Sequence, residues 1–205
     1  MKILVLGASG MAGHTIALYF KEQGYEVYAF SRKRFPFCTW IGGDAFDIEC
    51  LKNIVTTGNY DAIINCIGLL NQFADSAPEK AVYINSYLPN QVVAWLKDTP
   101  TRFIQMSTDC VFAGNKGPYD ECSVPDGCSY YDRTKALGEI VDDKNLTFRN
   151  SIIGPDINEH GIGLFHWFMK QHTPINGFTK AIWTGVTTLT LAKAMERALQ
   201  TNLTG

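Results

Sequence analysis

The stretch Lys2-Ile3-Leu4-Val5-Leu6-Gly7-Ala8-Ser9-Gly10-Met11-Ala12-Gly13 decides the fold of this 205-residue chain. An apolar run of strand length leads directly into a glycine-rich loop, and the loop opens an amphipathic stretch over residues 11–23 that ends at Gly24. Glycines let the backbone turn tightly and approach a pyrophosphate, and the helix start offers unpaired amide donors. The GxxGxxG spacing is weak by itself, but its place between a strand and a helix favours nucleotide binding over a plain glycine turn.

Outward from this loop, apolar runs alternate with longer amphipathic stretches. We predict strands over residues 2–6, 25–30, 61–67, 102–106 and 146–149, and helices over 11–23, 47–57, 79–97, 129–141, 164–170 and 187–199. This alternation predicts an α/β fold with a doubly wound parallel sheet covered by helices on both faces. Residues 151–163 are rich in Gly, Pro, Asn and Asp and are predicted to be a loop or joint. We therefore place a dinucleotide-binding domain at 1–150 and a smaller substrate-binding part at 151–205.

Composition excludes several classes of protein. Hydrophobic residues make up 46% and charged residues 19%, which excludes a disordered chain. A net charge of −2 excludes a strongly cationic nucleic-acid binder, and no apolar run has membrane-spanning length. The N-terminus lacks a signal-peptide pattern, so we expect a cytoplasmic protein. The six cysteines form no CxxC pair, so we expect free thiols.

The end of the second predicted strand bears on the choice of dinucleotide. Sites that prefer NAD place Asp or Glu about 20 residues past the glycine loop, where it binds the ribose hydroxyls. Here the strand runs into Ser31-Arg32-Lys33-Arg34, with no carboxylate. Cations suit a 2′-phosphate, and a guanidinium suits bidentate phosphate contacts. We therefore expect Ser31, Arg32 and Lys33 to contact the cofactor and favour NADP(H), with NAD(H) and a merely solvated basic loop as the alternatives.

Two further segments carry candidate chemistry. Tyr131 and Lys135 stand four residues apart, so on a helix they share one face. A nearby cation lowers the pKa of a tyrosine from its usual value of about 10, and such a tyrosine can give a proton to a carbonyl oxygen. Ser107-Thr108-Asp109 follows the strand at 102–106, where open parallel sheets bind ligands. A chance YxxxK match and a turn-capping role for Ser107 and Thr108 are the alternatives.

Taken in order, these residues resemble the extended short-chain dehydrogenase/reductase superfamily, and within it the dTDP-4-dehydrorhamnose reductase branch. The resemblance places the segment 44–48 after a third strand and extends over nearly the whole chain. The most specific block is Ser107-Thr108-Asp109-Cys110-Val111-Phe112-Ala113-Gly114. The other blocks are the glycine loop, 64–68, Tyr83-Ile84-Asn85 with Pro89, 118–121, Tyr131 to Lys135 with Gly138-Glu139, 149–151 and 183–188.

The resemblance implies a Rossmann fold and a role for each matching residue. Thr108, Tyr131 and Lys135 would be catalytic: Tyr131 would donate the proton, Thr108 would bind the substrate carbonyl, and Lys135 would lower the tyrosine pKa and hold the nicotinamide ribose. Further cofactor contacts would come from Gly7, Ser9, Gly10, Met11, Ala12, Asp47, Ile48, Cys66, Ile67, Gly68 and Asn85. The substrate would face Asp109, Val111, Phe112, Asn150 and Ser151.

Two departures from the branch concern the sugar. Cys110 stands where the branch usually has tyrosine, and Ile152 where it usually has tryptophan. Both positions touch the sugar in that branch, so we expect NADPH-dependent reduction of a nucleotide-linked 4-keto-6-deoxysugar other than the rhamnose precursor. A nucleotide-sugar epimerase or dehydratase and a non-catalytic, cofactor-binding regulatory subunit are the alternatives. A homodimer is compatible with the class.

Two expectations concern what is absent. His14, His160, His166 and His172 form no ligand pattern with acidic residues, so no metal site is expected. About 55 residues remain after the predicted dinucleotide domain, fewer than extended reductases usually carry. We therefore expect a truncated chain with an incomplete substrate-binding part.

Overall fold

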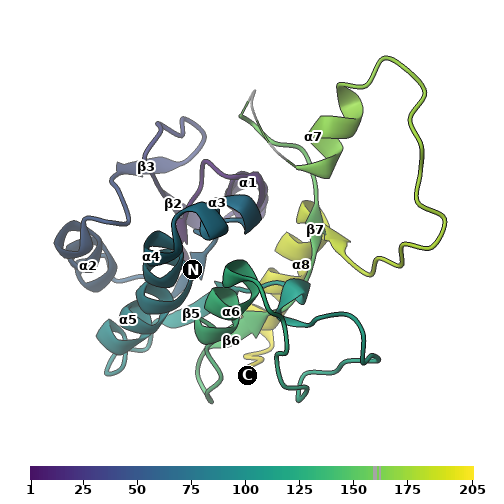
Figure 1. Cartoon of the computed structure of the whole chain (residues 1–205). Coiled ribbons are helices and arrows are strands. Elements are labelled where there is room, and N and C mark those ends of the chain that lie inside the picture. Colours follow the sequence, from purple (N-terminus) through teal and green to yellow (C-terminus); the bar gives the residue numbers. More distant parts are fainter. Residues whose placement is uncertain (159–160, 162) are drawn as a thin grey trace.

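A six-stranded parallel sheet forms the centre of the computed structural model, which describes residues 1–158, 161 and 163–205 (Figure 1). The strands lie in the order β3-β2-β1-β4-β5-β6, and every neighbouring pair is parallel. They are β1 (Lys2–Leu6), β2 (Glu26–Ser31), β3 (Thr39–Gly42), β4 (Ala62–Asn65), β5 (Arg102–Met106) and β6 (Leu146–Phe148). This order confirms the predicted Rossmann fold. From β1 the chain adds strands first on one side (β2, β3) and then on the other (β4, β5, β6), and folds of this kind bind ligands at the switch point between β1 and β4.

Helices cover both faces of the sheet. They are α1 (Met11–Glu22), α2 (Ile48–Thr57), α3 (Asn71–Ser76), α4 (Pro78–Ala81), α5 (Leu88–Trp95), α6 (Tyr130–Leu137), α7 (Leu164–Met169) and α8 (Thr188–Gln200). The alternation of β1 shows why: Ile3 and Val5 point into one hydrophobic cluster, and Leu4 and Leu6 point into the other. A strand that is buried on both faces needs a helix on each side.

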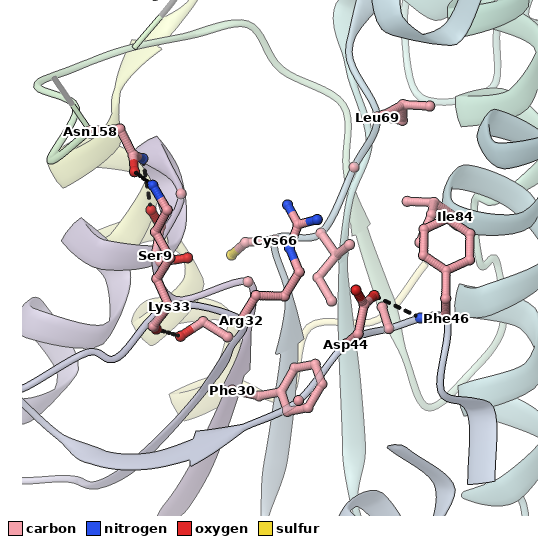
Figure 2. A pocket seen from close by; sticks show the side chains of 17 residues that line it. Ser9, Phe30, Arg32, Lys33, Asp44, Phe46, Cys66, Leu69, Ile84 and Asn158 are labelled. Carbon is pink, nitrogen blue, oxygen red and sulfur yellow. Dashed lines mark hydrogen bonds between the residues drawn. The ribbon is translucent and has the colours of Figure 1, made fainter. Parts of the chain in front are cut away.

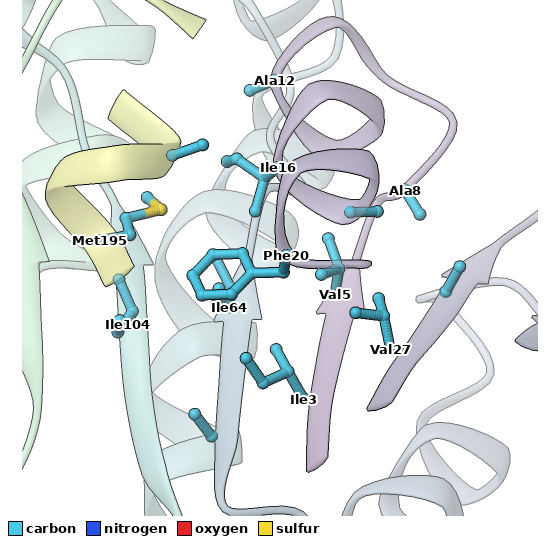
Figure 3. Close-up of a cluster of buried hydrophobic side chains, with 14 of the residues drawn as sticks. Ile3, Val5, Ala8, Ala12, Ile16, Phe20, Val27, Ile64, Ile104 and Met195 are labelled. Atoms are coloured by element: carbon cyan, nitrogen blue, oxygen red, sulfur yellow. The ribbon is translucent and has the colours of Figure 1, made fainter. Parts of the chain in front are cut away.

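The helices α1 and α8 pack together on one face. Figure 3 shows Met195 of α8 beside Phe20 and Ile16 of α1, above Ile64 and Ile104 of the sheet, and all five side chains are buried in one cluster. The opposite face is covered by α2 and α5, whose apolar side chains form the second cluster. Because α8 belongs to the first cluster, the predicted ranges 1–150 and 151–205 share one core.

Besides the helix α3, strand structure lies in two places where the residue pattern gave none. Three of the four residues of β3 are exposed at the sheet edge, so no apolar run marks it; the family resemblance had implied a third strand there. The second is β7 (Ile152–Ile153), which pairs with β8 (Val186–Thr187) in a separate two-stranded sheet. The expectation of a plain loop over 151–163 is therefore wrong at its start. Figure 1 shows α7 and the loop after it projecting away from the central sheet.

The predicted helix at 79–97 is interrupted by a π-helical turn. It runs as α4, the π turn Val82–Tyr87 and then α5. Pro89 has no N–H to bond the carbonyl of Asn85. A Cβ on Gly138 would lie 1.8 Å from that carbonyl oxygen, so the end of α6 packs directly against the backbone here. π turns of this kind often occur at functional sites.

Candidate active site

The glycine loop is fixed by close backbone contacts. Gly7 has φ +82°, a conformation that favours glycine, and its N–H donates to the carbonyl of Phe30 at 2.9 Å. A Cβ on Gly13 would lie 2.2 Å from the carbonyl oxygen of Gly7, so the first turn of α1 lies against the loop. A Cβ on Gly10 would have its nearest neighbour at 3.4 Å, so the loop leaves space beside Gly10. No side chain caps α1, and its first amide groups lack intrahelical partners.

A first cavity of about 420 Å³ opens at this loop, and Figure 2 shows its lining. Arg32 extends into it from the end of β2, between Lys33 and Asn158 on one side and Asp44 on the other. Among the described residues, Arg32 has no hydrogen-bond or ion-pair partner. The predicted residues that line this cavity are Gly7, Ser9, Gly10, Ser31, Arg32, Lys33, Cys66, Ile67 and Gly68. A basic rim and a glycine cradle fit the phosphate groups of a dinucleotide.

A second cavity, of about 630 Å³, contains the predicted catalytic residues Thr108, Tyr131 and Lys135. It adjoins the first, because Gly10, Cys66, Ile67 and Gly68 line both. Its other predicted lining residues are Met11, Ala12, Asp109, Asn150 and Ser151. Both cavities have the size of small-molecule sites, which is about 300–1,000 Å³. Together the two cavities extend along the carboxyl ends of the strands, from the end of β2 past the switch point to the end of β5.

Tyr131 enters the second cavity from the first turn of α6. Ser129 and Asp132 form a capping box, which fixes where this helix begins. Burial raises the pKa of Tyr131 to about 12, and a hydrogen bond with the side chain of Thr108 acts in the opposite direction. The pKa thus lies above its usual value rather than below it, contrary to our expectation. The phenol is fully protonated near neutral pH, which is the form that a proton donor needs.

Lys135 lies one turn further along α6 and is buried. Its ammonium group donates a hydrogen bond to the carbonyl of Met106 at the end of β5. Burial lowers the pKa of Lys135 to about 8, while the neighbouring Cys66 and Glu139 side chains act to raise it. Burial likewise raises the pKa of the Cys66 thiol to about 12, so this thiol is neutral.

The end of β5 is held by a buried ion pair. The Ser107 hydroxyl donates to Glu139 at 2.6 Å, and Arg149 binds the same carboxylate with an N···O distance of 2.8 Å. Next to Ser107, the Thr108 hydroxyl donates to Asp109 and accepts from the N–H of Cys110, both at 3.2 Å. These contacts fix the direction of the Thr108 side chain toward the cavity.

Five predicted site residues lie outside both cavities. Asp47 caps α2, where it accepts from the N–H of Cys50 at 3.1 Å, and Ile48 packs against the second core cluster. Val111 is fully buried. Phe112 stacks on Tyr119, with ring centroids 4.4 Å apart. The fifth, Asn85, is described next.

Asn85 supports the site from behind. Its amide accepts from the N–H of Leu69 at 2.8 Å and donates to the Leu69 carbonyl at 2.9 Å. It also donates to the Thr134 hydroxyl at 3.1 Å. Asn85 therefore joins the loop after β4 to α6, the helix that carries Tyr131. Gly68 of that loop lines both cavities.

Several lining residues were not predicted. In the first cavity they include Asp44, Ala45, Phe46 and Asn158. The resemblance had indicated the segment 44–48, but Asp47 and Ile48 were chosen from it. In the second cavity they include Asn71, Gln72, Cys110 and Asp156. Asn158 follows Pro155-Asp156-Ile157, and no local pattern distinguishes it.

The donor set of the two cavities fits a dinucleotide. In the part of the chain that the structure describes, no three His, Cys, Asp or Glu side chains gather as metal ligands; His160 lies outside that part. All six cysteines are free. The amide oxygen of Asn150, at the second cavity, is buried without a hydrogen-bond partner among the described residues, as expected for an atom that a ligand satisfies.

Among the described residues, none of the helices combines the length and the apolar character that a membrane crossing requires.

Comparisons with known proteins agree with this geometry. Residues 1–153 match the family described as RmlD substrate binding domain. The chain is 31% identical over 143 residues to the probable low-salt glycan biosynthesis reductase Agl14 of Haloferax volcanii, covering 68% of this chain and 48% of the relative. It is 28% identical over 143 residues to methionine adenosyltransferase 2 subunit beta of Xenopus tropicalis, covering 67% and 41%. The chain thus spans about half the length of the curated relatives it matches.

Solved structures share the whole arrangement. A crystal structure of a hypothetical dTDP-4-dehydrorhamnose reductase from Sulfolobus tokodaii superposes with a TM-score of 0.85 at 26% identity, covering 100% of this chain and 74% of that one. The dTDP-4-dehydrorhamnose reductase of Bacillus anthracis, solved in complex with NADP, has a TM-score of 0.83 at 22% identity, covering 100% and 73%, and supports the fold. The match over residues 1–153 and the shared fold place the chain in the RmlD substrate binding domain family of the extended short-chain dehydrogenase/reductase superfamily.

Proposed function

We propose that the protein catalyses the NADPH-dependent reduction of a nucleotide-linked 4-keto-6-deoxysugar. The observation that carries this proposal is the second cavity, in which Thr108, Tyr131 and Lys135 line one space that adjoins the glycine loop. The basic rim at Arg32 and Lys33 supports NADP(H) over NAD(H). Asn150, Ser151 and Asp109 supply polar contacts for the sugar part. When bound, the nicotinamide supplies the hydride.

The chain's own residues have distinct tasks in this reaction. The protonated Tyr131 donates its proton to the carbonyl oxygen of the sugar. The Thr108 hydroxyl, whose single hydrogen lies toward Asp109 in the structure, would turn it to that oxygen when the sugar binds. The Lys135 ammonium is held at the end of β5 by the Met106 carbonyl. Its charge stabilises the negative charge that develops on the carbonyl oxygen of the sugar during reduction. Burial of these side chains strengthens their electrostatic contributions.

Replacement of the proton donor tests the proposal. Tyr131→Phe should reduce turnover of dTDP-, UDP- and GDP-4-keto sugars at least about 100-fold, because a positioned general acid contributes 10²–10⁴-fold. NADPH affinity should stay within about twofold, because one hydroxyl is removed and the cavity keeps its shape. The measurement is NADPH oxidation, with fluorescence titration of the cofactor in parallel. If the wild-type chain binds NADPH but reduces none of these sugars, the reductase proposal is wrong.

A second candidate function is that of a cofactor-binding subunit of another enzyme. Its support is the similarity to methionine adenosyltransferase 2 subunit beta, at 28% identity. Such a role needs the first cavity but makes no use of a protonated Tyr131 beside Thr108. A stoichiometric enzyme partner in a pull-down, together with no reductase turnover, would favour it.

A further inference from the structure

Asn158 joins two parts of the first cavity that are far apart in sequence. Its side-chain N–H₂ group donates to the Ser9 carbonyl in the glycine loop at 3.0 Å. Its side-chain oxygen accepts from the Lys33 ammonium, beyond the end of β2, at 3.3 Å. Figure 2 shows both bonds at one side of the cavity, opposite Asp44. The segment after β7 therefore completes a cavity that residues 7–84 otherwise form.

The orientation of this amide is fixed by its other partner. The N–H₂ group also donates to the Asp156 carboxylate at 2.9 Å, and the same carboxylate accepts from the backbone N–H of Asn158. Two acceptors, Ser9 and Asp156, use both side-chain hydrogens. The oxygen is then the atom that faces Lys33, so the side chain presents an acceptor to the ammonium and cannot reverse without losing both donor contacts.

Lys33 is held at its other end as well. The Ser31 hydroxyl donates to the backbone carbonyl of Lys33 at 2.7 Å, and Ser31 itself accepts from the Trp40 indole at 3.2 Å. A lysine side chain with both ends held loses little further freedom when an anion arrives. The neighbouring Arg32 has no such support among the described residues.

We propose that Asn158 is a positioning residue of the cofactor site, which holds the Lys33 ammonium at the cavity rim for the 2′-phosphate of NADP(H). This inference rests on the proposed function. Asn158 would act on the cofactor through Lys33 and, separately, through the Ser9 carbonyl. The second route steadies the glycine loop, which NADPH and NADH use equally. The route through Lys33 concerns the 2′-phosphate, which only NADPH carries. Loss of that route should therefore weaken NADPH binding more than NADH binding, whereas loss of the route through Ser9 should weaken both equally.

The test compares two cofactors in four proteins. The Kd values of NADPH and NADH are measured by fluorescence titration for the wild type, Asn158→Ala, Lys33→Ala and the double variant. Asn158→Ala should lower the affinity ratio of NADPH to NADH by about three- to tenfold, the effect of one lost hydrogen bond to a positioned charge. In the Lys33→Ala background it should leave the ratio unchanged. Asn115→Ala, at an exposed residue that lines neither cavity, is the matched control and should match the wild type.

Several results would overturn the inference. An equal loss of NADPH and NADH affinity in Asn158→Ala would make Asn158 a support of the glycine loop and no more. A further fall of the ratio in the double variant would show that Asn158 acts without Lys33. If the wild type binds neither cofactor, the proposed function fails and takes this inference with it. Binding of both cofactors with an unchanged ratio in Asn158→Ala leaves the proposed function intact and contradicts this inference alone.

Discussion

Lys135 sets the pH range over which the proposed catalytic side chains, Tyr131 and Lys135, are both protonated. Its pKa is lowered to about 8, so the ammonium is charged below that pH and loses its charge as pH rises through it. The pKa of Tyr131 is raised to about 12, so the phenol stays protonated over the same range. One ionisation therefore changes near physiological pH, and it belongs to the lysine.

This gives a pH profile with a single alkaline limb. We expect kcat/KM for keto-sugar reduction to fall as pH rises through about 8, because kcat/KM reports ionisations of the free enzyme. Lys135→Arg keeps its charge at higher pH, so any residual activity should lose this limb. A wild-type limb that persists unchanged in Lys135→Arg would assign the ionisation to another group.

At the scale of elements, two ion pairs in different surroundings can be compared. Glu139 and Arg149 join the end of α6 to the end of β6, and their side chains are 5% and 20% exposed. Lys116 and Asp126 lie in a loop, and their side chains are 72% and 21% exposed. A buried carboxylate left without its partner is costly, whereas a solvated pair contributes little.

Stability measurements separate the two cases. Arg149→Ala should lower the free energy of unfolding by about 3–5 kcal/mol, because it leaves the Glu139 carboxylate buried and unpaired. Lys116→Ala should leave the free energy of unfolding nearly unchanged, since water replaces the lost contact. Urea unfolding followed by circular dichroism measures both. Equal losses in the two variants would show that the buried pair does not hold the ends of β5 and β6 together.

The elements also show what local sequence can predict. The strand β1, the glycine loop and α1 could be predicted because an apolar run, three glycines and an amphipathic stretch follow one another within residues 2–23. The strand β3 lies at an exposed edge and has no such pattern. The π turn before Pro89 depends on the close approach of Gly138 from another helix. Contacts of this kind join distant segments, and no window of sequence contains them.

The same limit applies to the candidate site. Thr108 could be placed because it closely follows β5, and Tyr131 and Lys135 because they share one face of the predicted helix that became α6. Asn158 could not, since it reaches the glycine loop from 149 residues away. Asn85 was assigned to the cofactor from a motif, but in the fold its amide is used by Leu69 and Thr134.

At the scale of the whole molecule, the site depends on both ends of the chain. The helix α8 covers one face of the sheet, and the segment after β7 closes the first cavity beside the glycine loop. The two cavities form one path from the basic rim to Tyr131. This arrangement makes NADP(H) binding the property on which every proposed step depends.

Titration of the wild-type chain with NADPH and with NADH tests that property most directly. We predict saturable binding of one NADPH per chain, tighter than that of NADH because of the basic rim at Arg32 and Lys33. Gly10→Ala should keep the melting temperature, since its Cβ would meet its nearest neighbour at 3.4 Å, yet it should weaken NADPH binding by filling the loop where the phosphates approach. An absence of binding to the folded wild-type chain, or equal affinity in Gly10→Ala, would contradict the assignment of this site.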